Sequence, residues 1–207
     1  GAHIGIPVAH IQAGEVSGNI DGMTRHAIAR YAHIHFAANK DAAVRLERSG
    51  EQLERIFNVG APQLDEFVNG VVSTAIQIEE RFNIDVSESF ILLVQHPVTE
   101  EFASSGHQMD LTLKAVLSFD MKIIIIAPNS DAGTVGVGAA IEENMRPNMH
   151  VYRNIDRADY AGLMARAAVI VGNSSSGLLE APSFELPCVN IGRRQLGRVQ
   201  GENVINC

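Results

Sequence analysis

Short apolar runs alternate along the chain with stretches whose apolar residues recur at helical spacing. The runs are continuous rather than interrupted by polar residues, which is typical of strands buried on both faces of a sheet. The predicted strands are 6–11, 34–38, 56–59, 90–95, 122–127, 150–152, 169–172 and 188–191, and another begins within 203–207. The predicted helices are 21–31, 41–49, 63–82, 111–119, 139–145, 160–167 and 177–184. This order predicts an α/β fold with parallel sheets covered by helices.

The pattern restarts after residues 62–85, which predicts two doubly wound, Rossmann-like domains. We expect residues 1–66 to be the remainder of an N-terminal domain and residues 67–207 a C-terminal domain. About three strands fall in the first part, where such sheets usually have five or more, so the first domain is expected to be truncated. The second is expected to be truncated at its end, because a strand begins as the chain stops.

Composition and charge narrow the class of protein. Of 207 residues, 46% are apolar and 19% charged, as in soluble globular proteins, and the net charge of -8 argues against nucleic acid as the main partner. The longest apolar run, 121–128, is too short to span a bilayer, and no signal peptide is visible, so we expect a cytoplasmic protein. Cys188 and Cys207 fit no disulfide framework or metal-ligand spacing.

Ligands of open parallel sheets bind beyond the carboxyl ends of the strands, so the residues after each strand are the candidates. The sequence Gly-Asn-Ser-Ser-Ser-Gly at 172–177 follows a predicted strand and opens a predicted helix. Hydroxyls and free backbone N–H groups at such a place can hold a diphosphate, although one serine there would also serve as an ordinary helix cap. Glu180, four residues after Ser176, lies on the same helix face and could accept bonds from ribose hydroxyls.

Polar residues follow other predicted strands as well. His96, between Gln95 and Pro97, could bind phosphate or transfer protons, and Asn129 and Asp131 could contact a ligand or simply form a turn. Carboxylates that could act as acid or base follow the first strand. The residues of this group are Glu15, Asp21, Arg25 and His26. Three arginines after the strand at 188–191, Arg193, Arg194 and Arg198, suit the charge of a diphosphate or of a solvated loop.

Together these segments resemble the UDP-N-acetylglucosamine 2-epimerase family, in particular its hydrolysing branch. The matching stretches are 10–28, 58–67, 95–102, 127–133, 172–198 and 201–204, in the order of the family. The resemblance implies a GT-B-like architecture of two Rossmann-like domains. It also implies that the chain lacks an N-terminal segment with a phosphate-binding arginine and a C-terminal helical stretch.

The resemblance implies roles for particular residues. The residues implied to bind UDP are Asn129, Ser174, Ser175, Glu180 and Arg194. His96 corresponds to an essential histidine of the family and Asp21 to one of its acid/base carboxylates. Where many members have a catalytic glutamate, this chain has Gln12, so Glu15 or Asp21 would have to serve.

The implied reaction removes the C2 proton of the sugar, eliminates UDP to give a 2-acetamidoglucal, and adds water to release N-acetylmannosamine. It requires no metal or redox cofactor, and family members often form homo-oligomers. The alternatives are the same reaction on UDP-diacetylbacillosamine, a GT-B glycosyltransferase with an acceptor site, and a non-catalytic UDP-sugar-binding module.

Overall fold

The computed structural model describes residues 4–128 and 130–207. These residues form two compact units, each described here by itself. Unit 1 is the chain up to Val68 together with Leu196–Val199, and unit 2 is Asn69–Gln195 with Gln200–Cys207. The sequence analysis placed the domain limit at 66/67, without the return of 196–199 to the first unit.

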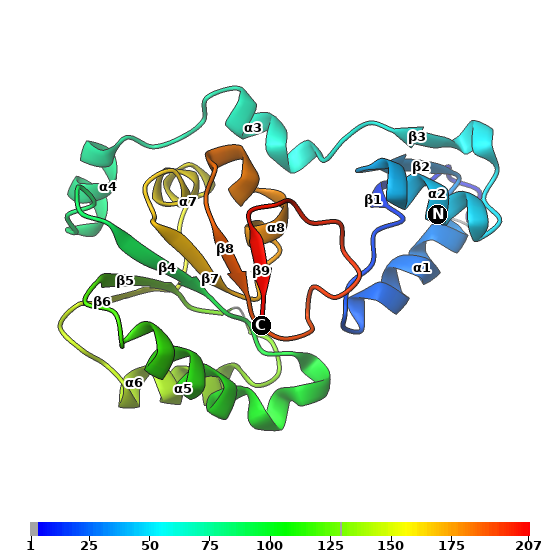
Figure 1. Ribbon diagram of the computed structural model, residues 1–207. Coiled ribbons are helices and arrows are strands. Elements are labelled where there is room, and N and C mark those ends of the chain that lie inside the picture. Colours follow the sequence, from blue (N-terminus) through cyan, green and yellow to red (C-terminus); the bar gives the residue numbers. More distant parts are fainter. Residues whose placement is uncertain (1–3, 129) are drawn as a thin grey trace. The chain divides into compact units, whose positions relative to one another are not determined.

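Unit 1 is a three-stranded parallel sheet with its helices, in the strand order β1-β2-β3 (Figure 1). Its elements are β1 (Ala9–Ala13), α1 (Asp21–Tyr31), β2 (Ile34–Ala37), α2 (Lys40–Arg48), β3 (Ile56–Asn58) and α3 (Asp65–Val68), with 3-10 turns at Leu53–Arg55 and Pro62–Leu64.

Small side chains let α2 lie close to the sheet of unit 1. Ala13, Ala37, Ala42 and Leu46 are buried together, and a Cβ added to Gly14 would lie 2.3 Å from the carbonyl oxygen of Ala42. The helix begins where the side chain of Asn39 accepts a hydrogen bond from the backbone N–H of Ala42, at 2.8 Å. This packing fixes the loop that follows β1.

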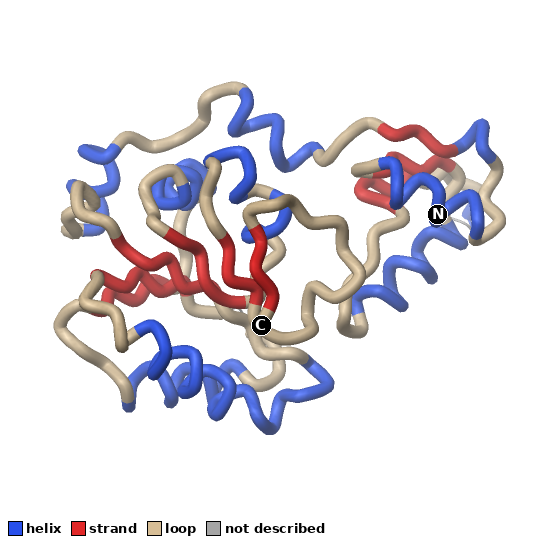
Figure 2. The backbone as a smooth tube through the Cα atoms, in the orientation of Figure 1, coloured by secondary structure: helices blue, strands red, loops and turns tan. Residues whose placement is uncertain are grey.

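Unit 2 is a six-stranded parallel sheet in the order β6-β5-β4-β7-β8-β9. Its strands, red in Figure 2, have helices on both sides. Its strands are β4 (Phe90–Val94), β5 (Lys122–Ile126), β6 (Met149–Tyr152), β7 (Val169–Gly172), β8 (Cys188–Asn190) and β9 (Val204–Asn206). Its helices are α4 (Ala75–Phe82), α5 (Ser105–Val116), α6 (Thr134–Glu143), α7 (Arg157–Met164) and α8 (Ser176–Leu179), with 3-10 segments at Thr99–Ser104 and Ala181–Phe184. The doubly wound parallel sheet predicted for this part is confirmed.

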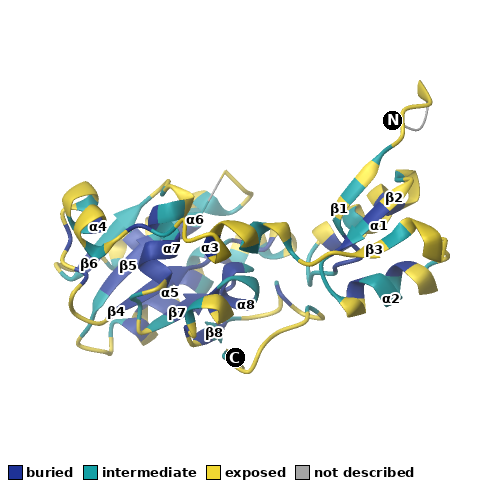
Figure 3. Ribbon diagram, turned by 90° about the horizontal axis from the view of Figure 1, so that it is seen from above, coloured by how far each residue is buried: buried dark blue, intermediate teal, exposed yellow. Residues whose placement is uncertain are grey.

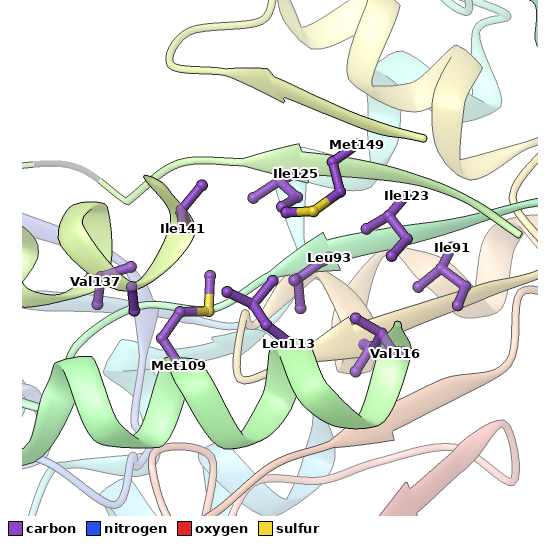
Figure 4. Close-up of a cluster of buried hydrophobic side chains, with 12 residues drawn as sticks. Ile91, Leu93, Met109, Leu113, Val116, Ile123, Ile125, Val137, Ile141 and Met149 are labelled. Atoms are coloured by element: carbon purple, nitrogen blue, oxygen red, sulfur yellow. The ribbon is translucent and has the colours of Figure 1, made fainter. Parts of the chain in front are cut away.

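The core of unit 2 lies on the central strands, which are the most buried elements in Figure 3. Side chains of β4 and β5 meet those of α5 and α6 on one face of the sheet (Figure 4). Leu92 and Ile124, which point to the other face, are also fully buried. Burial on both faces explains why these strands are continuously apolar.

Several predicted elements differ from the structure. The predicted helices 111–119, 139–145 and 160–167 begin and end earlier, as α5, α6 and α7. The predicted helix 63–82 is two helices, α3 and α4, because Gly70 adopts a φ of +77° and Thr74 starts α4 with a capping box to Gln77. The predicted helix 177–184 is one α-helical turn followed by a 3-10 segment, since Pro182 has no N–H to continue the α-helix. The first strand is Ala9–Ala13 rather than 6–11.

Candidate functional site

A loop of residues 172–176, here called the serine loop, follows β7 at the carboxyl edge of the unit 2 sheet. It begins at Gly172, whose φ is +132° and where an added Cβ would lie 2.1 Å from the carbonyl oxygen of Val94. Only glycine allows the ends of β7 and β4 to approach so closely. The loop is therefore placed directly beside the residues that follow β4.

Asn173 ties the serine loop to His96. The buried amide of Asn173 accepts a hydrogen bond from the backbone N–H of His96 at 2.7 Å and donates one to its carbonyl oxygen at 2.8 Å. Both backbone groups of His96 are thus satisfied by one side chain, which sets the direction in which the imidazole leaves the chain.

The serines of the loop join a chain of hydroxyl groups. The Ser176 hydroxyl bonds to that of Tyr160 at 2.6 Å and donates to that of Ser174 at 2.8 Å. Burial raises the pKa of Tyr160, so its phenol stays protonated and available as a hydrogen-bond donor. Within the described part of the chain, the backbone N–H groups of Ser174 and Ser175 donate to no protein acceptor. Such N–H and hydroxyl groups can bind the oxygens of a phosphate.

A cavity of about 370 Å³ opens in front of the serine loop. The polar side chains that line it are His96, Arg153, Asn154, Arg157, Tyr160, Ser174, Ser175, Ser176 and Glu180. The Arg157 guanidinium lies 3.4 Å from Glu180 Oε1. Burial raises the pKa of Glu180, while Arg157 acts in the opposite direction. The cavity therefore offers a cation and hydroxyls for a phosphate, and a carboxylate that can accept hydrogen bonds.

His96 is neutral at physiological pH. Burial, with a smaller contribution from the Arg194 charge, lowers its pKa to about 4, and Asp131 opposes this shift. A neutral imidazole has one N–H donor and one acceptor nitrogen, so it can donate to a phosphate oxygen without carrying a charge.

The three arginines predicted beside the serine loop have separate partners. Arg194 Nη1 donates to the backbone oxygen of Asn173 at 3.1 Å, so it supports the loop, and the residues that line the cavity do not include it. Arg193 pairs with Glu101 in unit 2, whereas Arg198 lies in unit 1. Within unit 2 the structure ties Arg194 to the serine loop, and a diphosphate role for Arg193 and Arg198 stays a prediction.

The two predicted acid/base carboxylates lie in unit 1 and differ in exposure. Glu15 is 6% exposed. Asn39 Nδ2 lies 3.5 Å from Glu15 Oε1, and Arg198 Nη2 lies 3.8 Å from Glu15 Oε2. Asp21 is exposed at the first position of α1, where Asn19 contacts its side chain at 3.3 Å. Asp21 is therefore the more accessible of the two to a ligand.

Gln12, which stands where many family members have a glutamate, lies in a distorted part of β1. The register with β2 shifts between Ile11 and Ala13, and Gln12 has a φ of +55°. A residue other than glycine seldom adopts this left-handed conformation, and such residues cluster at functional sites.

Asn129, predicted to contact UDP, lies outside the described residues. The structure brings His96, Ser174, Ser175 and Glu180 to one cavity and places Glu15 and Asp21 in the other unit. Arg153, Asn154, Arg157 and Tyr160 also line the cavity, and none of them is among the predicted site residues. All four lie in the segment 153–160, which follows the predicted strand 150–152 and carries no motif that would mark a site.

No group of three or more His, Cys, Asp or Glu side chains suited to a metal ion occurs in residues 4–128 and 130–207. Within the same ranges, every helix is too short or too polar to cross a membrane.

Known proteins resemble the chain over nearly its whole length. The family model for UDP-N-acetylglucosamine 2-epimerase matches residues 1–207. A UDP-N,N'-diacetylbacillosamine 2-epimerase (hydrolyzing) of Legionella pneumophila is 40% identical over 99% of this chain and 54% of its own length. A UDP-N-acetylglucosamine 2-epimerase of Neisseria meningitidis is 31% identical over 96% of the chain and 52% of its own length. The chain thus spans about half the length of these curated relatives.

Solved structures show the same fold. The complex of S. aureus MnaA with UDP superposes with a TM-score of 0.76 over 93% of this chain and 52% of its own, at 18% identity. The Methanocaldococcus jannaschii UDP-GlcNAc 2-epimerase in complex with UDP-GlcNAc and UDP gives 0.74 over 91% and 54%, at 19% identity. The expected GT-B-like, Rossmann-like α/β fold is confirmed, and because the family model covers every residue, the chain belongs to the UDP-N-acetylglucosamine 2-epimerase family.

Proposed function

We propose that the chain is part of a hydrolysing UDP-sugar 2-epimerase and that unit 2 binds the UDP group. The observation that carries this proposal is the cavity before the serine loop. It combines the backbone N–H groups of Ser174 and Ser175, which have no acceptor among residues 4–128 and 130–207, with the hydroxyl of Ser174, the cation Arg157 and the carboxylate Glu180. A diphosphate needs the donors and the cation, and a ribose needs an acceptor for its hydroxyls.

Each residue of the cavity has a proposed role. The N–H and hydroxyl groups of Ser174 and Ser175 bind phosphate oxygens, and Arg157 offsets their charge. Glu180 accepts hydrogen bonds from the ribose. Arg194 contributes by holding the backbone of Asn173, and so keeps the loop in shape. Asn129 remains a proposed UDP contact from the resemblance alone.

The proposed reaction couples an elimination to a hydration. A base removes the proton from C2 of the sugar as the bond between C1 and the phosphate oxygen breaks, and its electrons leave with UDP. Water then adds across the C1–C2 double bond, with the hydroxyl at C1 and a proton at C2 on the opposite face. Asp21 and Glu15 are the proposed acid/base residues, and the exposed Asp21 is the better placed to exchange protons.

His96 is proposed to donate its neutral N–H to the departing diphosphate. The low pKa supports this role, because the imidazole stays uncharged over the whole physiological range. A neutral donor stabilises the negative charge that forms on the leaving oxygen and needs no proton from solvent.

The 40% identity to the Legionella pneumophila protein favours the UDP-diacetylbacillosamine reaction over that on UDP-N-acetylglucosamine, for which the Neisseria meningitidis protein is 31% identical. A cytoplasmic location remains a proposal from the sequence, and a homo-oligomer remains a proposal from the resemblance.

The test uses a protein of the relatives' full length that contains this chain. It is incubated with each of the two sugar nucleotides, and the products are identified by NMR. Release of UDP together with a free 2-epimeric sugar supports the proposal, and the faster substrate is the one assigned. Release of UDP only when a sugar acceptor is added would instead indicate a glycosyltransferase, and binding without turnover a binding module.

A further inference from the structure

Two faces of helix α7 make different contacts. Arg157 and Tyr160, three residues apart, lie on the face that reaches Glu180 and Ser176. Asp159 and Gly162, also three residues apart, lie on another face and contact the segment 69–82. Neither Asp159 nor Gly162 is among the residues that line the cavity.

Asp159 is an almost fully buried carboxylate, with 1% of its surface exposed. One of its oxygens accepts a hydrogen bond from the Ser73 hydroxyl at 2.6 Å, and the other accepts one from the Arg81 guanidinium at 2.5 Å. The backbone N–H of Ser73 also donates to the carbonyl oxygen of Ala158 at 3.0 Å. A buried charge engaged on both oxygens resists displacement, because each partner lost would leave it unsatisfied.

The segment around Ser73 lies directly against the helix. A Cβ added to Gly162 would meet the backbone oxygen of Ser73 at 2.6 Å and the side chain of Ile78 at 2.7 Å. Arg166 donates to the same oxygen at 3.3 Å. Ser73 is thus held through its N–H, its hydroxyl and its carbonyl, all by residues of α7 or of the turn that follows it.

We propose that Ser73 and Asp159 are positioning residues for the UDP site: they fix the rotation and axial position of α7, and α7 presents Tyr160 and Arg157 to the serine loop. The bond between Tyr160 and Ser176, at 2.6 Å, depends on this placement, because a shift of about 1 Å would break it. The identity of the ligand rests on the proposed function, whereas the mechanical link does not.

The first test is a double-mutant cycle measured by calorimetry of UDP against this chain. Asp159→Asn is expected to weaken UDP binding about tenfold, because the neutral amide loses the charge that pairs with Arg81 and keeps only one oxygen for the two donors, Ser73 and Arg81. In a Tyr160→Phe, Arg157→Ala background the same change is expected to weaken binding by less than about twofold, because the residues through which it acts are gone. An equal loss in both backgrounds, or no loss in either, would overturn the inference.

The second test needs no ligand. Hydrogen exchange by mass spectrometry is expected to accelerate about tenfold at residues 156–164 and 174–180 in Asp159→Asn and to stay unchanged in α5. Ser73→Ala, which removes only a hydroxyl, is expected to give the same pattern to a smaller extent and covers the case in which the first variant does not fold. Exchange that is unchanged at 174–180, or that rises equally in α5, would contradict the inference.

Asp110→Asn is the matched control, because Asp110 pairs with Lys114 at 2.6 Å and with Asn144 on the α5 and α6 side of the sheet. It is expected to leave UDP affinity and the exchange of 174–180 unchanged. If the unsubstituted chain binds no UDP, the proposed function fails, and the exchange measurement alone decides the positioning role.

Discussion

The side chain of Asn173 closes a pair of hydrogen bonds with the backbone N–H and carbonyl groups of His96, at 2.7 and 2.8 Å. Two segments 77 residues apart in the sequence are joined by this one amide. The serine loop and the histidine that faces the cavity are therefore a single structural feature, and a change at either is expected to affect the other.

Asn173→Ala is expected to destabilise the protein by about 2 to 4 kcal/mol, because two backbone groups of His96 lose their partners. Urea unfolding measures the change. Asn148→Ala is the control, since its amide donates one hydrogen bond, to the backbone oxygen of Met121, and it is expected to cost about 1 kcal/mol. If both variants lost the same free energy of unfolding, the two hydrogen bonds of Asn173 would stabilise the protein no more than the single bond of Asn148.

His96 is expected to titrate near pH 4 in the folded protein. Because its folded pKa lies below the unfolded value of 6.5, the unfolded state binds the proton first as the pH falls. The free energy of unfolding is therefore not reduced by His96 above pH 6.5. It falls by at most about 3 kcal/mol as the pH drops from about 6.5 to 4. The NMR shift of the imidazole protons measures the pKa.

Loss of one imidazole signal in His96→Gln identifies the NMR resonance of His96. In this variant the free energy of unfolding should depend less on pH between about 4 and 6.5. The other histidines with lowered pKa values, His10 and His150, remain in this variant, so the difference between the two profiles isolates His96. A His96 titration midpoint near 6.5 would disprove the proposal that a neutral imidazole persists because it is buried.

Glu180→Ala is expected to weaken UDP binding about tenfold, since a hydrogen bond to a charged group contributes about 1.5 to 3 kcal/mol. The variant should bind 2'-deoxy-UDP and UDP with similar affinity if the carboxylate contacts the ribose. Calorimetry measures both ligands, and Glu143→Ala, an exposed glutamate at the end of α6, is the control. If Glu180→Ala preferred UDP over 2'-deoxy-UDP as strongly as the unsubstituted chain does, Glu180 would not contact the ribose.

Gly172→Ala is expected to destabilise unit 2 by more than about 3 kcal/mol, because the new Cβ would overlap the Val94 carbonyl, 2.1 Å away, at an unfavourable φ. Gly138→Ala is the matched control within α6, where an added Cβ meets nothing within 4 Å. It is expected to stabilise the chain by up to about 1 kcal/mol. Similar melting temperatures for both variants would contradict the close approach of β7 and β4.

Much of the fold could be predicted from hydrophobic pattern. The helix at 21–31 and the strand at 169–172 have the predicted bounds, because their apolar spacing and flanking residues agree. The break at Gly70 and the change to a 3-10 segment at Pro182 were missed, since the apolar spacing continues across both. Local backbone chemistry decided these two places.

The candidate site was predicted where its residues follow strands. Ser174, Ser175, Glu180 and His96 were found in this way and share one cavity. Arg157 and Tyr160 also follow a strand, but no motif marks them, and their partners lie on another element. The bond between Asn173 and His96 could not be predicted, because it joins segments 77 residues apart.

The most direct test of the UDP site is calorimetry of UDP and of uridine against this chain. The account predicts that UDP binds at least about thirtyfold more tightly than uridine, a difference of about 2 kcal/mol, because the diphosphate engages the serine loop. It also predicts that Ser174→Ala narrows this gap. Equal affinities for UDP and uridine, or no heat with UDP at millimolar concentration, would contradict the central claim.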